Sequence, residues 1–251
     1  MTKDKRKDKL RQFFMEMASD PNIISGIHNY CDRWCERCTH TSHCSVYKME
    51  NVLDDENSES ESLDIINQKF WEQMSEMLQV AAQLLQETME ELEIDPNDLP
   101  EIKKEKPDPS KEKAVSIARE YTLEMVDWLK ANRDIISNIH EQLINNGGDN
   151  AQQIADNFEV IQYYFMIIST KTYRSFLQPT IENENHDALG SAKIALIMID
   201  RSIASWVKLY ELLPNYEDDA LTFLRKLTVV KKLILEKHPN AMKFKRPGFD
   251  D

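Results

Sequence analysis

The chain has 251 residues, of which 41% are hydrophobic and 30% are charged, proportions that suit a globular protein with a sizeable core. Only 5 glycines and 9 prolines are present, too few for the turns of a sheet-rich fold. The net charge of −13 disfavours non-specific binding to nucleic acid or to an anionic membrane.

Basic side chains gather near both ends of the sequence. Residues 1–11 hold six basic and two acidic side chains, and residues 225–246 hold eight basic and one acidic. We interpret both stretches as solvated helix faces, each of which leaves a local contact open.

The sequence shows no targeting segment. Its first residues lack the apolar run of a signal peptide, and no apolar stretch approaches the ~20 residues of a membrane span. We therefore expect a cytoplasmic protein without membrane contact, whose four cysteines stay reduced rather than form structural disulfides.

Helical periodicity dominates the chain. An amphipathic helix is expected over residues 5–17 and is ended by Asp20-Pro21, after which a short helix from residue 23 leads into the cysteines. Apolar residues three or four apart predict the remaining helices, at residues 63–92, 111–144, 150–177, 187–213 and 217–237.

Long helices joined by short loops predict an all-α fold: an antiparallel helical bundle with a small N-terminal cysteine-rich metal-binding segment. We expect that segment at residues 1–50 and the bundle at residues 62–238. An acidic, serine-bearing linker is expected between them at residues 51–61, and a proline-rich one within the bundle at residues 95–110. We expect residues 239–251 to form a loose basic tail.

The four cysteines form one contiguous block. They follow the pattern C-x3-C-x2-C-x5-C, as Cys31, Cys35, Cys38 and Cys44. On a helix, with ~100° per residue, the first three sulfurs fall within an arc of roughly 60° and face one spot, while the fourth returns after a loop. Thiolates are soft ligands, so the pattern predicts a four-cysteine metal site.

The spacing favours a [4Fe–4S] cluster over zinc, because zinc prefers paired C-x2-C knuckles separated by a longer gap. An unmetallated thiol cluster is the third alternative. The last three cysteines resemble the cluster loop of the helix-hairpin-helix DNA glycosylases, from which we carry over only the ligand geometry. The first three resemble the radical-SAM motif, whose α/β barrel this chain has no strands to build. His28, His40 or His43 lies close enough in the sequence to take the place of one cysteine as a metal ligand.

Residues around the cysteines have expected supporting roles. Tyr30, Trp34, Val46 and Tyr47 are expected to shield the site and dock it onto the bundle. Arg33 and Arg37 are placed to donate hydrogen bonds toward anionic sulfurs.

A polar stripe crosses two of the most apolar predicted helices. Its members are Glu159, Lys171, Arg174, Lys193, Asp200 and Arg201. One interpretation is a pocket between helices for a small anionic ligand. The one we favour is a salt-bridge network that fixes helix register, with Glu159 paired to Lys193 and Asp200 paired to Arg174.

Missing motifs limit the function classes. The sequence has no E-x-x-H, no G-x-x-x-x-G-K-[ST], no G-x-G-x-x-G and no G-x-S-x-G, which leaves ferritin-like di-iron, ATPase, Rossmann and α/β-hydrolase chemistry without support. Whether the protein is an enzyme stays open.

Two motifs together carry a resemblance. The pairing of YCDRWCERC…C with DAxGSAKxALxxIDRSxxxW resembles a group of bacterial all-helical proteins over most of the chain. That resemblance implies the fold and no activity. We therefore keep three hypotheses: a metal protein whose cluster is structural, redox-active or sensory, a zinc-stabilised protein-interaction module, and a helical enzyme or binding protein for a small anionic ligand. The partner is a protein or a small molecule in each case.

Overall fold

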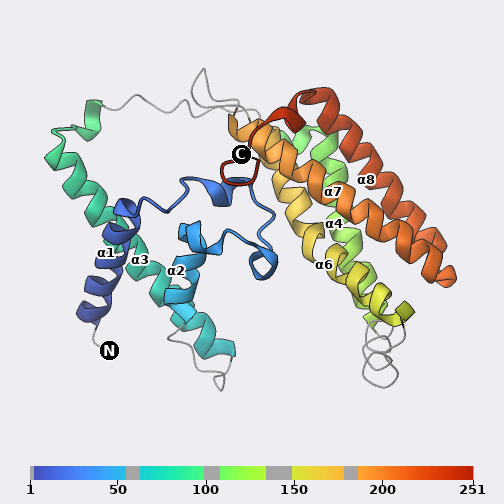
Figure 1. The fold of residues 1–251 in the computed structure, drawn as a ribbon, viewed down its shortest axis with the longest axis horizontal. Helices are drawn as coiled ribbons and strands as arrows, with labels where there is room; N and C mark the ends of the chain where they lie inside the picture. The colour runs from blue at the N-terminus through green and yellow to red at the C-terminus, as the bar shows by residue number, and fades with distance from the viewer. Residues whose placement is uncertain (1–2, 55–62, 99–107, 134–148, 178–185, 251) are drawn as a thin grey trace. The chain divides into compact units, whose positions relative to one another are not determined.

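The computed structural model of the chain describes residues 3–54, 63–98, 108–133, 149–177 and 186–250, and these residues form an all-α protein with no strand among them (Figure 1). The predicted fold class is confirmed at this level. The chain forms two compact units. Unit 1 comprises Met1–His28 and Cys35–Ile102, and unit 2 comprises Asn29–Trp34 and Lys103–Asp251.

Unit 1 contains the helices α1 (Lys3–Ser19), α2 (Ser45–Asp54) and α3 (Leu63–Glu91). The basic helix α1 packs along the acidic helix α3, where Arg6 Nη1 lies 3.3 Å from Glu76 Oε2. Buried side chains of this contact are Leu10, Gln73, Glu76 and Val80. Residues 1–11 thus form a solvated face only in part: Lys5, Asp8 and Lys9 are exposed, whereas Arg6 pairs with Glu76 of α3.

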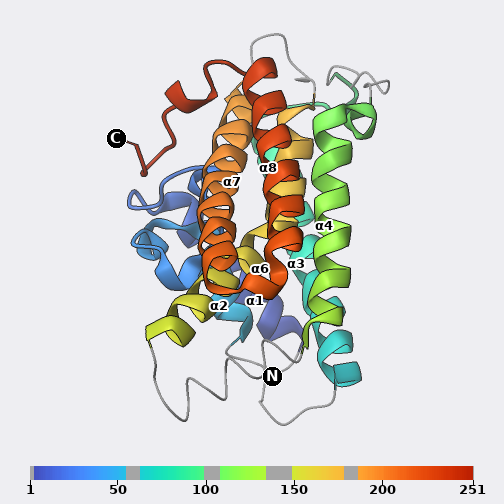
Figure 2. The same ribbon diagram turned by 90° about the vertical axis from the view of Figure 1, so that its right-hand side faces the viewer.

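Unit 2 contains α4 (Lys113–Ala131), α6 (Asp149–Ser175), α7 (His186–Leu212) and α8 (Glu217–Lys237), which lie side by side (Figure 2). Both α6 and α8 pack against α4 and against α7. Aromatic side chains fill the centre: Trp206 stacks on Phe223 with ring centroids 4.8 Å apart, and its Nε1 donates to the Tyr121 hydroxyl at 3.3 Å.

The helix bounds follow from periodicity and from end signals. Five of the predicted helices begin and end within two residues of α1, α3, α6, α7 and α8. Three acidic residues, Glu217, Asp218 and Asp219, occupy the first turn of α8, where the helix dipole stabilises negative charge. Residues 134–144 of the predicted fourth helix lie outside the described residues, and α2 had no counterpart among the predictions.

The domain boundaries differ from those expected. Helix α3 belongs to unit 1 rather than to the bundle, and the boundary between residues 102 and 103 falls inside the predicted linker 95–110. Residues 51–54 continue α2, whereas the rest of the predicted linker 51–61 lies outside the described residues. The tail is attached rather than loose: Ala241–Lys243 forms a 3-10 turn, and the side chain of Ala241 is fully buried.

Candidate metal centre

The cysteine segment, residues 31–44, is built of short turns rather than of one helix. Its 3-10 turns span Cys35–Arg37 and Thr41–His43. Between the first two cysteines, Arg33 has φ 64°, a left-handed conformation that ends any right-handed helix. The prediction that the first three cysteines share one helix face is therefore wrong.

The side chains on either side of Arg33 explain this break. Asp32 Oδ1 accepts a hydrogen bond from Trp34 N at 3.3 Å, which supports a turn. The Trp34 indole is only 7% exposed and stacks on Tyr163 with ring centroids 4.4 Å apart. Burying an aromatic side chain stabilises by roughly 2–3 kcal/mol, which outweighs helix propensities of a few tenths of a kcal/mol per residue.

Two of the thiols accept hydrogen bonds from the backbone two residues further on. The Arg33 N–H donates to the Cys31 thiol, and the His40 N–H lies 3.4 Å from Cys38 Sγ. A third bond, from Cys38 N to Cys35 O at 3.1 Å, closes a tight turn between these two cysteines. Backbone N–H groups directed at sulfur stabilise thiolates, which is the form that binds metal.

The surroundings of Cys31 are partly buried and cationic. Burial raises the pKa of the Cys31 thiol, while the Arg33 N–H and the positive charges of Arg33 and Lys171 act in the opposite direction. Burial, with repulsion from Arg174 as the next cause, lowers the pKa of Lys171 to about 8. The Lys171 ammonium donates to Asn29 O at 2.6 Å. These cations would compensate a thiolate at Cys31.

Asp32 ties the segment 29–34 to α6 and α7. The Tyr164 hydroxyl donates to Asp32 Oδ2 at 2.9 Å, and the Arg201 guanidinium donates to both of them. Burial, followed by the negative charge of Asp32, raises the pKa of Tyr164 to about 12, so the phenol remains a donor. The Tyr163 hydroxyl donates to Arg33 O. Within unit 2, the Cys31-bearing segment is therefore held by backbone and side-chain contacts at consecutive residues.

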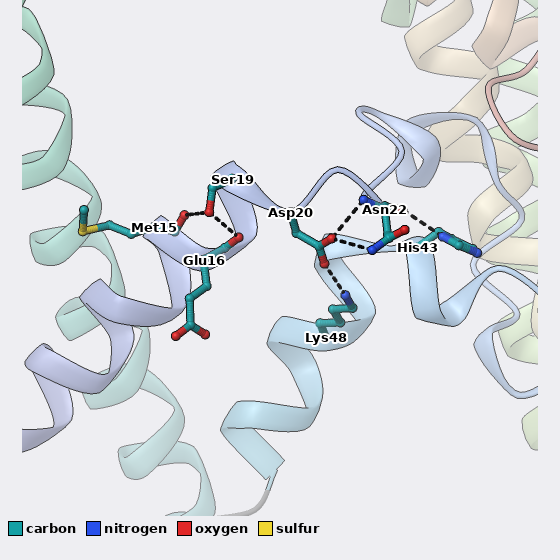
Figure 3. Close-up of polar contacts among 7 residues, drawn as sticks. All are labelled: Met15, Glu16, Ser19, Asp20, Asn22, His43 and Lys48. Carbon is teal, nitrogen blue, oxygen red and sulfur yellow. Dashed lines mark hydrogen bonds and ion pairs between the residues drawn. The ribbon is translucent and has the colours of Figure 1, made fainter.

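Unit 1 holds the other end of the cysteine segment through the turn that follows α1 (Figure 3). Lys48 Nζ lies 3.0 Å from Asp20 Oδ2, which ties the first turn of α2 to this turn. The His43 ring Nδ1 lies 2.8 Å from Asn22 O, and Ile24 N donates to His43 O at 3.1 Å. Cys44 therefore lies between two fixed elements, and one ring nitrogen of His43 is already occupied.

The polar stripe binds segments of its own chain. Lys171 and Arg201 hold residues 29–34, as described above, and Lys193 Nζ binds Phe244 O at 2.7 Å and Asp250 Oδ2 at 2.6 Å. The two predicted pairs are wrong, since Lys193 pairs with Asp250 rather than with a residue of α6.

The remaining stripe residues have partners near the helix surfaces. Arg174 pairs with Asp187 at 2.7 Å, and Asp200 pairs with Lys231 at 2.6 Å. Glu159 is exposed on α6. Simple antiparallel pairing along α6 and α7 missed these partners because two of them, Lys231 and Asp250, come from later in the chain.

All four cysteines are half-buried. Cys31 belongs to unit 2, whereas Cys35, Cys38 and Cys44 belong to unit 1. Among the described residues, no group of three or more His, Cys, Asp or Glu side chains is assembled so that it could hold a metal ion.

Comparison of the chain with protein-family models, with curated proteins and with solved structures found no match. Within the described residues, no helix combines the length and the apolar character needed to cross a bilayer. The conclusions about function therefore rest on the residues themselves.

Proposed function

We propose that this chain is a metal-binding helical protein in which Cys31, Cys35, Cys38 and Cys44 ligate one centre, a [4Fe–4S] cluster. The observation that carries the proposal is the repeated N–H···S contact, at Cys31 from Arg33 and at Cys38 from His40. Such contacts stabilise thiolates and set the potential of thiolate-bound iron. Cations at Arg33 and Lys171 favour the negative charge that a thiolate-ligated centre carries.

The donor set fits a thiolate-ligated centre. Four thiols within one short stretch of chain supply soft ligands. The segments between the cysteines contain the short 3-10 turns Cys35–Arg37 and Thr41–His43, and ligation of one centre would order these turns around it. Metal binding and local folding are commonly coupled in this way. When bound, the centre would supply a structural crosslink, electron transfer or a sensory response.

Zinc is the alternative metal, and one observation favours it. Cys35 and Cys38 flank a tight 3-10 turn closed by the bond from Cys38 N to Cys35 O, which suits a C-x2-C knuckle. In that case the protein is a zinc-stabilised interaction module with a protein partner. Either metal requires reduced thiols, which a cytoplasmic environment maintains.

The experiment is anaerobic purification of the full chain together with single cysteine variants. Cys38→Ser should remove the visible absorption of thiolate-bound iron, whereas His43→Ala, a matched change to a non-ligand in the same segment, should leave it intact. If the protein is colourless and contains stoichiometric zinc, the iron–sulfur assignment fails and the zinc alternative stands. The proposed function fails if neither metal copurifies with the protein and if the addition of iron or zinc does not order the cysteine segment.

We also propose that α4, α6, α7 and α8 form an antiparallel bundle that supports this site. Arg174, near the end of α6, pairs with Asp187, near the start of α7. Tyr164, in the middle of α6, contacts Arg201, further along α7. This order of contacts is consistent with two helices that run in opposite directions.

A pocket for a small anionic ligand at the polar stripe has less support. Lys171, Lys193 and Arg201 already bind residues of the same chain, so a ligand would have to displace them. A thermal-shift screen of wild type and Lys193→Met against anionic metabolites tests this second candidate. A ligand that raises the melting temperature of wild type but leaves that of Lys193→Met unchanged would revive it.

A further inference from the structure

Residues 29–34 meet the last residues of the chain over one glycine of α7. Gly190 is buried, and a Cβ placed on it would lie 2.2 Å from Cδ1 and Cε1 of Tyr30 and 3.0 Å from Cε1 of Phe244. The two aromatic rings lie against each other with centroids 4.9 Å apart. The absence of a side chain at Gly190 thus lets both rings contact the helix, and one of them directly precedes Cys31.

Lys193, three residues further along α7, holds the residue that carries the second ring, Phe244. Lys193 Nζ donates to Phe244 O at 2.7 Å and to Asp250 Oδ2 at 2.6 Å. The two side chains of this ion pair are only 10% and 20% exposed. Gly190 and Lys193 share one face of α7, since residues three apart are neighbours on a helix.

The Asp250 carboxylate also closes the tail on itself. It accepts hydrogen bonds from Arg246 N at 2.9 Å and from Arg246 Nε at 2.9 Å, and Arg246 Nη2 lies 2.8 Å from its second oxygen. The Arg246 guanidinium lies 4.9 Å from the ring centroid of Phe249. Residues 244–250 therefore form a compact loop around one carboxylate, anchored to α7 by one lysine.

We propose that residues 244–250 act as a clasp that holds the Cys31-bearing segment against α7. Phe244 packs against the Tyr30 ring, and Lys171 fixes the carbonyl of the preceding residue, Asn29. Loss of the Lys193–Asp250 ion pair opens the loop of residues 244–250 and leaves Phe244 held by one hydrogen bond from Lys193, which loosens Phe244, and with it Tyr30 and the neighbouring thiol. The clasp controls access to Cys31 in the metal-free chain. If the proposed function holds, it also positions Cys31 as a ligand, and this second role rests on that function.

The test measures the alkylation rate of each cysteine in the metal-free full chain by peptide mass spectrometry. Asp250→Asn removes the negative charge that pairs with Lys193 and keeps nearly the same side-chain shape. Asp250→Glu keeps the negative charge and should therefore restore the contact. Asp200→Asn is the matched control, because it makes the same change in another ion pair of α7, with Lys231. Cys44, in unit 1, is the internal reference.

Asp250→Asn should raise the alkylation rate at Cys31 on the order of tenfold, the size expected for a lost charge-assisted hydrogen bond. The rate at Cys44 should not change, Asp200→Asn should behave as wild type, and Asp250→Glu should restore most of the protection. Phe244→Ala provides a second variant that opens the clasp without touching its charges. Unchanged Cys31 rates in both Asp250→Asn and Phe244→Ala would overturn the proposal.

A metal arm separates this proposal from the proposed function. Iron or zinc release to a chelator is followed in wild type and in Asp250→Asn, and faster release in the variant shows that the clasp positions a ligand. If no metal binds at all while Cys31 alkylation still responds to Asp250→Asn, the proposed function fails and the clasp stands. If metal binds but neither release nor alkylation responds, the clasp fails and the proposed function stands.

Discussion

Gly190→Ala should destabilise unit 2, although alanine is the better helix former. The substitution removes a glycine from the interior of α7 and should gain about 1 kcal/mol in helix propensity. Against this, the new Cβ lies 2.2 Å from two Tyr30 ring atoms, and an ordinary contact needs at least 3.4 Å. The ring must move as a whole, because both atoms belong to it. Overpacking costs about 1–3 kcal/mol, and a contact this short lies at the upper end, so we expect a net loss of about 1–2 kcal/mol.

The assay is urea unfolding followed by tryptophan fluorescence in a Trp71→Phe background, so that the signal comes from Trp34, Trp128 and Trp206 of unit 2. Ser191→Ala is the matched control on the next residue of the same helix. Its buried hydroxyl has no hydrogen-bond partner among the described residues, so its removal should be neutral or stabilising.

A double variant isolates the contact. Adding Tyr30→Ala removes the ring that the new methyl group strikes and leaves only the 3.0 Å approach to Phe244 Cε1. Gly190→Ala should then lose most of its cost and approach the gain of about 0.5–1 kcal/mol that helix propensity gives. The reasoning is refuted if Gly190→Ala stabilises unit 2 while Tyr30 is present, because that result would mean that the ring does not lie over the helix.

Three further predictions concern individual side chains. Trp34→Ala empties a buried, stacked site and should cost unit 2 about 3–5 kcal/mol in the same urea assay, and a loss below about 1 kcal/mol would contradict the packing. Arg6→Gln leaves the buried Glu76 without its cation and should cost about 1–3 kcal/mol. Arg11→Gln, in an exposed ion pair that solvent screens, should change stability much less, and equal costs of the two substitutions by chemical denaturation would count against this difference. Hydrogen bonds from Arg246, and then from Lys193, hold the pKa of Asp250 well below the usual range of an aspartate. Because the folded-state pKa is depressed, the contribution of Asp250 to stability is complete above the unfolded pKa of about 3.9 and is lost as the pH falls further, so the urea midpoint of wild type should drop more steeply below about pH 4 than that of Asp250→Asn.

The helices themselves could be predicted from the sequence. Helix α7 shows why: Ala192, Ala195, Ile199 and Trp206 recur at helical spacing, all four are buried, and Pro214 follows shortly after the helix. The periodic spacing of apolar residues can be recognised from the sequence of one helix alone, without knowledge of its partners in the fold.

The cysteine segment could not be predicted in the same way. The letters CDRWCERC contain no helix breaker, so spacing alone favoured one helix with three sulfurs on a face. The burial of Trp34 and the bonds from Asp32 to Tyr164 and Arg201 override that preference. The partners of Asp32 lie 132 and 169 residues away along the chain, and nothing in the local pattern indicates them.

The polar stripe shows the same limit. Two of its charges, Lys171 and Lys193, are buried and have partners, as the cost of an unpaired buried charge requires. Glu159, Asp200 and Arg201 are exposed instead. The partner of Lys193 is Asp250, from a tail whose composition indicated a loose end. An acidic residue close to the chain end, after a run of basic ones, was the available signal for that contact.

The metal content of anaerobically purified protein tests the central claim most directly. The proposed function predicts about four irons and about four acid-labile sulfides per chain in wild type, with loss of both when Cys31 or Cys38 is replaced by serine. A chain that folds fully with four titratable thiols and no bound iron or zinc would contradict it.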